Sequence, residues 1–175
     1  MDGQVSQLSV IETEKFKAVN TNRFLAYWQK QKGDQLRPRI TDIDWMEIAD
    51  IAPSLCIRDV IDDPNDLLCR FWGTKFAESY RVECTGKLIS QTYTPIGAKN
   101  TLKLHHMALA SDLPLRLIGT LGYADKSEFI TFEGVMLCVD GKQAPKQHIY
   151  AVGQFDYKLD EEDQKLIKSH KFDMR

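Results

Sequence analysis

Hydrophobic positions alternate with polar ones along several stretches of the chain, and this period of two predicts β-strands. Residues 67–72 carry bulky side chains on both faces and end at Gly73, so we expect a strand that is paired on its edges and covered on at least one face. A turn-rich break at 62–66 joins it, as a hairpin, to an earlier strand over 55–61. Three later strands are predicted to form an antiparallel meander, over 115–123, 129–139 and 148–155.

Apolar positions that recur every three or four residues predict helices elsewhere. One amphipathic helix is expected over residues 16–30, and a longer one near 99–111. The aromatic stripe of the first helix would cover the sheet of its own chain or pair with the same helix of a second chain. We favour packing within the chain, because most apolar stripes belong to a core. The stripe comprises Phe16, Val19, Phe24, Tyr27 and Trp28.

These elements divide the chain into three parts. Residues 1–14 are polar and lack periodicity, which predicts a flexible N-terminal segment over 1–18. The strands and longer helices fall within one domain over 19–158, which includes the first helix. A short helix or tail is expected over 159–175. The pattern therefore predicts a single α+β domain with two extensions.

The composition and net charge of the chain bear on which classes of binding partner are expected. The 175 residues include 43% hydrophobic and 27% charged residues, an ordinary globular composition with material for one core. A net charge of -2 gives no cationic excess for nucleic acid or an anionic membrane. We see no apolar run that could span a bilayer and no leader pattern at the N-terminus, so we expect a cytoplasmic protein.

The four cysteines are spread along the chain without a CxxC pair. This spacing predicts neither a zinc site nor a redox motif. We expect Cys56, Cys69, Cys84 and Cys138 to be reduced and to act as small hydrophobic residues.

Several short motifs, taken in their order and spacing, resemble a family of short bacterial single-domain PAS proteins. They are Phe24-Leu25-Ala26-Tyr27-Trp28, Arg37-Pro38-Arg39, Asp42-Ile43-Asp44, Phe71-Trp72-Gly73-Thr74 and Thr85-Gly86. The resemblance covers roughly residues 20 to 155. The expected order of elements agrees with it: two strands, short helices, a longer helix and three strands, after a flanking helix.

The resemblance implies a PAS-like α+β fold, a five-stranded antiparallel sheet with helices on one face plus the N-terminal flanking helix. It also implies a sensory or regulatory protein in signal transduction. It further implies a homodimer through the flanking helix, with Phe24, Tyr27 and Trp28 at the interface. The chain departs from the family pattern at Arg81, where glycine is usual, and arginine tolerates a left-handed backbone poorly.

Candidate pocket residues come from the strands. Trp72, Phe132 and Tyr150 would offer apolar or stacking walls to a small-molecule ligand. Arg116, if it faces the pocket, would recognise a carboxylate or phosphate. The alternative, which we favour, is that Arg116 pairs with Glu133 or Glu128, because an antiparallel sheet usually has one wet face.

Adjacent histidines on the longer helix raise the question of a metal or haem. His105 and His106 point about 100° apart on a helix, so they do not easily share one metal. His106 lies on the stripe of Leu102 and Leu109 and is the better candidate for an axial haem ligand. We favour a packed histidine over haem, and the residues around Cys84 do not match a flavin photoreceptor motif. The sequence assigns no cofactor.

Catalytic motifs were not found in the sequence: neither a nucleophile with a base, nor a phosphate-binding glycine loop, nor a metal triad. The first hypothesis is therefore a sensor that binds a small molecule and signals through an unidentified protein partner, and not an enzyme. An adaptor or dimerisation module without a ligand is the alternative, and it predicts a filled core. A small α+β enzyme is the third reading, and it requires a convergent cluster of polar groups.

Overall fold

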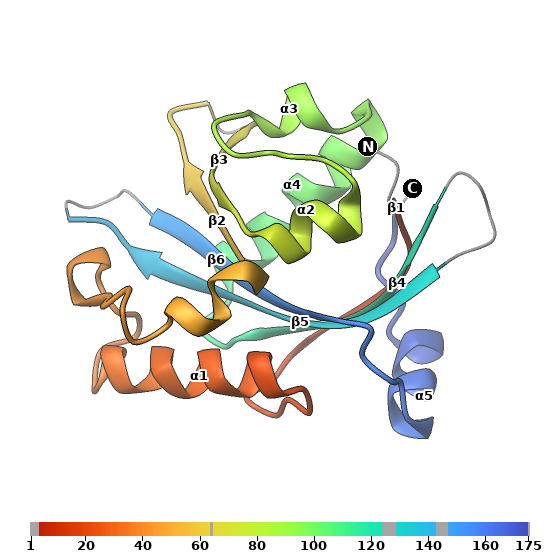
Figure 1. Ribbon diagram of the computed structural model, residues 1–175, viewed down its shortest axis with the longest axis horizontal. Coiled ribbons are helices and arrows are strands. Elements are labelled where there is room, and N and C mark those ends of the chain that lie inside the picture. Colours follow the sequence, from red (N-terminus) through yellow and green to blue (C-terminus); the bar gives the residue numbers. More distant parts are fainter. Residues whose placement is uncertain (1–3, 64, 124–128, 143–146, 175) are drawn as a thin grey trace.

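One antiparallel sheet of six strands, in the order β1-β4-β5-β6-β2-β3, organises the part of the chain that the structure describes. The structure is a computed structural model, and it describes residues 4–63, 65–123, 129–142 and 147–174. Helices lie on both faces of the sheet, with α1 on one side and α2, α3 and α4 on the other (Figure 1). The α+β class expected from the sequence is confirmed.

The strands are β1 Gln4–Glu12, β2 Leu55–Val60, β3 Leu67–Trp72, β4 Leu115–Gly122, β5 Phe129–Asp140 and β6 Gln147–Phe155. The α-helices are α1 Val19–Lys32, α2 Thr74–Tyr80, α3 Ile89–Thr92, α4 Pro95–Ala110 and α5 Glu161–Ser169. Two short 3-10 helices, η1 Ile40–Asp42 and η2 Ala49–Ser54, lie between α1 and β2. The five strands predicted from alternation are therefore present.

The alternation along β5 separates two cores. Val135, Leu137 and Val139 pack with α1 in one cluster. Phe132 and Met136, which point to the other face, belong to a second cluster with residues of α4 and β1. Because successive side chains of a strand point to opposite faces, one buried strand serves both cores.

The prediction of a five-stranded sheet and of a flexible N-terminal segment was wrong for residues 4–12. These residues form β1, which pairs antiparallel with β4 at the edge of the sheet. Leu8 is buried, while the polar residues Gln4 and Gln7 of the same strand are exposed. Polar residues are interspersed among the apolar ones of this edge strand without regular alternation, so its sequence looks like that of an unstructured segment.

The aromatic stripe of α1 packs against the sheet of its own chain. The exposed fractions of Phe24, Tyr27 and Trp28 are only 1%, 6% and 4%. The Trp28 indole Nε1 donates to the Cys138 carbonyl oxygen at 3.0 Å. The expected homodimer interface through these three side chains is therefore contradicted, because burial inside one chain leaves no exposed stripe for a second.

The C-terminal residues return to the sheet, in line with the short helix expected over 159–175. The Asp160 carboxylate caps α5 by accepting from the Asp163 backbone N–H at 2.9 Å. Beyond the helix, the Phe172 backbone N–H donates to the Leu8 carbonyl oxygen at 2.8 Å. The Asn100 side-chain amide of α4 then donates to the Met174 carbonyl oxygen at 2.8 Å. The chain end thus bridges β1 and α4.

Arg81 ends α2 in the left-handed conformation, with φ 52°. The sequence had marked this position as one where glycine is usual. The Arg81 guanidinium lies 4.1 Å from the centre of the Tyr123 ring, a cation–π contact that offsets part of the backbone cost.

Across the described residues, no helix has the length and apolarity needed to cross a membrane.

Candidate functional site

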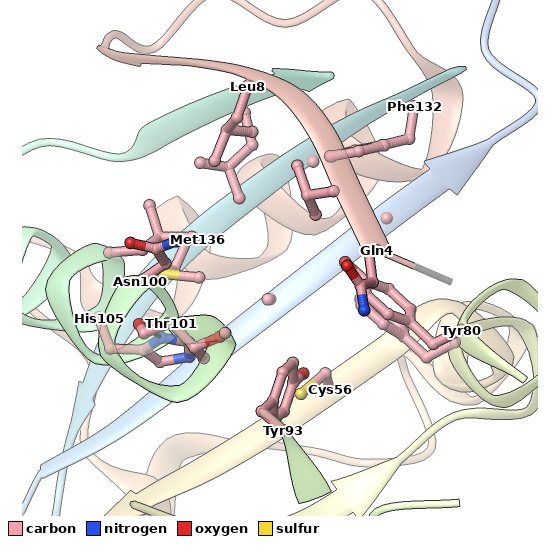
Figure 2. Close-up of a pocket in the computed structure, with 18 of the residues that line it drawn as sticks. Gln4, Leu8, Cys56, Tyr80, Tyr93, Asn100, Thr101, His105, Phe132 and Met136 are labelled. Carbon is pink, nitrogen blue, oxygen red and sulfur yellow. Dashed lines mark hydrogen bonds between the residues drawn. The ribbon is translucent and has the colours of Figure 1, made fainter. Parts of the chain in front are cut away.

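A cavity of about 470 Å³ lies between the sheet and the helices α2, α3 and α4. Figure 2 shows Gln4 and Leu8 of β1, His105 of α4 and Tyr93 arranged around this space. The side chains of Phe172 and Met174, from the C-terminal segment, also line it. A volume of this size is typical of pockets for small organic ligands.

The floor of the cavity is a row of three paired residues. Leu117 of β4 is opposite Gly134 of β5, which is opposite Gly153 of β6. All three line the cavity. Because the two glycines carry no side chain, neighbouring side chains approach the backbone closely: Leu117 lies 3.4 Å from where a Cβ of Gly134 would be, and the Phe155 ring lies 3.1 Å from that of Gly153.

Arg58 of β2 lines the cavity and is 3% exposed. Its Nη2 donates to the Tyr93 hydroxyl at 2.8 Å, whereas Nε and Nη1 are buried without a hydrogen-bond partner. The guanidinium carbon lies 5.5 Å from the centre of the Trp72 ring and 5.4 Å from that of Tyr93. Two aromatic rings therefore hold a buried cation in place without neutralising it.

Tyr93 does not supply the missing negative charge. Burial raises the pKa of its phenol to about 12, against the opposing effect of the Arg58 charge. The phenol is therefore neutral at physiological pH and acts only as a hydrogen-bond acceptor toward Arg58.

Cys56 precedes Arg58 by two residues and, like Arg58, lines the cavity. Its side chain is a thiol, which can lose a proton and become a negatively charged thiolate. Burial by itself raises the pKa of the Cys56 thiol, but a hydrogen bond with Cys69, together with the charge of Arg58 and a hydrogen bond to it, reverses this effect and lowers the pKa. All four cysteines are buried and free, as the sequence led us to expect.

His105 of α4 is held as a neutral ring. Its Nδ1 lies 2.6 Å from the Thr101 carbonyl oxygen, to which it donates. Burial, and secondarily the charge of Arg58, lower the pKa of His105 to about 3. At neutral pH the ring therefore presents an uncharged surface to the cavity.

The buried His105 ring makes the stability of the fold pH-dependent. Its folded-state pKa of about 3 is below the unfolded value of 6.5, so the unfolded chain takes up a proton first as the pH falls. The stabilisation is complete above the unfolded pKa and is lost as the pH falls toward the folded pKa. Between pH 7 and pH 5 we expect this group to lower the free energy of unfolding by about 2 kcal/mol, measured by urea denaturation.

Two variants isolate this effect from other titrating groups. His105→Gln lacks the titrating ring and should lose less stability than the wild type between pH 7 and pH 5. His106→Gln removes the exposed neighbouring histidine and should keep the wild-type dependence. Equal pH dependence in the wild type and His105→Gln would contradict a buried neutral ring.

Two of the five predicted pocket residues, Trp72 and Phe132, line the cavity. His106 does not line it, because His106 is exposed on the solvent side of α4 while His105 faces inward. The choice of His106 as an axial haem ligand was therefore wrong for this cavity. The stripe of Leu102 and Leu109 indicated a helical face, but it was not the face that is most buried.

Arg116 and Tyr150 lie on the opposite face of the sheet. The Arg116 Nε donates to the Glu133 carboxylate at 2.6 Å and Nη2 donates to Asp163 at 3.0 Å, as in the pairing favoured from the sequence. Glu128, the other partner considered, lies outside the described residues. Tyr150 stacks near Phe24 of α1, with ring centres 6.4 Å apart. Neither residue is part of the candidate site.

Arg58, Tyr93 and His105 were missed by the sequence reasoning. Arg58 carried a readable signal, because Arg58 and Asp59 are two charged residues in the middle of a predicted strand that is otherwise apolar. Such a residue must be paired or must face a ligand. Tyr93 lies in the connection between α3 and α4, and no periodicity marked it.

Metal binding finds no support in the described part of the chain, where no group of three or more His, Cys, Asp or Glu residues could hold an ion. The cavity lining combines one buried cation, the neighbouring Cys56 thiol, neutral polar groups and an extensive apolar wall. Comparisons of the chain with protein-family models, with curated proteins and with solved structures found no match.

Proposed function

We propose that this chain is a sensory or regulatory domain that binds a small molecule in the cavity between the sheet and α2–α4. The observation that carries the proposal is the cavity itself, about 470 Å³ with the unneutralised Arg58 in its wall. A space of this size in an otherwise close-packed core costs stability, and a ligand would recover part of it.

A PAS-type fold is part of the proposal. Its support is the chain order, in which β2 and β3 precede three helices, α2 to α4, and β4, β5 and β6 follow them. This is the order that the motifs led us to expect. The additional strand β1 and the helices on both faces extend that pattern and do not interrupt it.

The two other functions have less support. A ligand-free adaptor was expected to have a filled core, and the cavity argues against it. An enzyme needs a general base or a nucleophile that a base activates. His105, with its pKa lowered to about 3, is a poor base at neutral pH, and the Cys56 thiol has hydrogen bonds with Cys69 and Arg58, neither of which is a base. We therefore propose binding without catalysis.

A cavity-filling variant tests the proposal. Gly134→Leu places a side chain on the cavity floor, and a Cβ at this position meets Leu117 at an acceptable 3.4 Å. We expect the wild type to bind the neutral fluorescent probe N-phenyl-1-naphthylamine and Gly134→Leu to bind it at least about tenfold more weakly. The measurement is a fluorescence titration.

Gly134→Ala is the matched control, because its single methyl group occupies little of the cavity and should leave probe affinity near the wild-type value. Near-ultraviolet circular dichroism establishes that each variant is folded before the titration. Failure of the folded wild type to bind apolar probes, or equal binding by the folded Gly134→Leu protein, would refute a ligand-binding cavity.

A further inference from the structure

Arg58 is a buried cation for which the described protein supplies no carboxylate. Its Nε and Nη1 have no hydrogen-bond partner, although the residue is 3% exposed. None of the residues that line the cavity is an aspartate or a glutamate. The other buried arginine of the sheet, Arg116, is by contrast paired with Glu133 and Asp163. An unpaired guanidinium in an apolar wall is costly unless a bound group completes it.

The surroundings of Arg58 limit the charge that the site can accept. Lys and Arg residues other than Arg58 are absent from the cavity lining, and His105 is neutral. The Tyr93 hydroxyl already accepts from Arg58. A ligand with one negative charge would match this single cation, whereas a doubly charged phosphate monoester would leave a charge buried without a partner.

Apolar side chains make up most of the remaining cavity wall. Figure 2 shows Cys56, which neighbours Arg58 on β2, and Tyr93 on one side of the space, with Leu8 and Phe132 on the opposite side. Leu117, Met136 and Phe172 add apolar wall. A ligand that reaches from Arg58 across the cavity would thus have an anionic end and an apolar body.

We propose that the ligand is an amphipathic monocarboxylate, a medium-chain fatty acid or an aryl-alkanoic acid, whose carboxylate pairs with Arg58 while its apolar part fills the cavity. This inference rests on the proposed ligand-binding function and specifies its chemical class. The carboxylate would accept from the guanidinium nitrogens that now lack partners. The rings of Trp72 and Tyr93 would hold the guanidinium in position for it.

Three probes that share a ten-carbon chain test the proposal: decanoate, decan-1-ol and decyl phosphate. Each displaces N-phenyl-1-naphthylamine from the full-length protein at pH 7, below the concentration at which the probe forms micelles. We expect decanoate to bind the wild type at least about tenfold more tightly than decan-1-ol, because a charge-assisted hydrogen bond is added to the same apolar contact. Decyl phosphate should bind more weakly than decanoate.

Arg58→Met retains the length of the side chain and removes its charge. We expect decanoate to bind this variant about 10 to 100-fold more weakly than the wild type, with decan-1-ol bound equally or better. Arg58→Lys retains the charge and should keep a preference for decanoate over decan-1-ol. The wild-type comparison of the three probes also tests the proposal if either variant fails to fold.

Other outcomes overturn the inference in distinguishable ways. If decan-1-ol binds the wild type as well as decanoate does, and Arg58→Met changes neither, the cavity binds ligands but Arg58 does not select an anion. If decanoate preference appears only in Cys56→Ala, the Cys56 thiolate is the counter-ion of Arg58. Tighter binding of decyl phosphate would identify a phosphate site. If no probe binds the folded wild type, the proposed function fails as well.

Discussion

Replacement of Glu133 by alanine is expected to lower the free energy of unfolding by about 3–5 kcal/mol, the cost of breaking a buried ion pair. Glu133 is fully buried on β5 and forms a carboxylate hub on the α1 face of the sheet. It accepts from Arg116 at 2.6 Å, from the Thr21 hydroxyl at 2.6 Å and from the Ala18 backbone N–H at 2.7 Å. Alanine would leave all three donors in the interior with fewer partners.

The loss of folding free energy should depend on how many of the Glu133 interactions a substitution removes, and it should not occur when an exposed glutamate is replaced. Glu133→Gln keeps the shape and some of the hydrogen bonds but loses the charge, so it should be destabilising by less than Glu133→Ala. Glu78→Ala serves as the control, because Glu78 is 63% exposed in a surface pair with Lys75, and solvent-exposed pairs of this kind contribute little to stability. Urea denaturation gives the three values, and a loss below about 1 kcal/mol in Glu133→Ala would contradict the hub.

Replacement of Gly73 by alanine is expected to destabilise the fold by about 3 kcal/mol through a backbone clash. A Cβ at Gly73 would lie 2.6 Å from the Ala52 carbonyl oxygen and closer still to that of Pro53. Both belong to η2, which also leads into β2. Since backbone atoms cannot rotate away, the β3–α2 junction would have to move from η2, and with it the wall of the cavity that contains Trp72.

Gly122→Ala is the matched control for this substitution. The nearest atom to a Cβ at Gly122 is the Ser6 Cβ at 3.7 Å, an ordinary contact, so the change should stay within about 0.5 kcal/mol. The urea midpoints of both variants are the measurement. If Gly73→Ala were as stable as Gly122→Ala, the β3–α2 junction would accommodate a Cβ at Gly73, and the expected backbone clash would be contradicted.

Alternation along the chain was sufficient to predict five strands and the long helix, because a buried sheet imposes a period of two and a packed helix a period of 3.6. The edge strand β1 escaped prediction since its polar and apolar residues do not alternate regularly. The dimer expectation for the α1 stripe failed for a related reason: periodicity shows that a face is covered, but not by which chain.

The site was harder to predict than the fold. Of the residues proposed from the sequence, Trp72 and Phe132 line the cavity, whereas Tyr150 lies on the opposite face of the sheet. Alternation shows which residues of a strand share a face, and it does not show which face carries the cavity. Gly134 of β5 and Gly153 of β6 are paired residues that both line the cavity, so the glycines of these strands are a signal that could have indicated the face.

The central claim is that the cavity holds a ligand. Native mass spectrometry of the purified wild type and of the Gly134→Leu variant tests this claim most directly. After incubation with decanoate, we expect the wild type to carry one additional non-covalent mass per chain that denaturation removes. We expect the variant to carry little or none. Unmodified wild-type protein under conditions that retain non-covalent ligands, or equal occupancy in the wild type and Gly134→Leu, would contradict a ligand-binding role for this cavity.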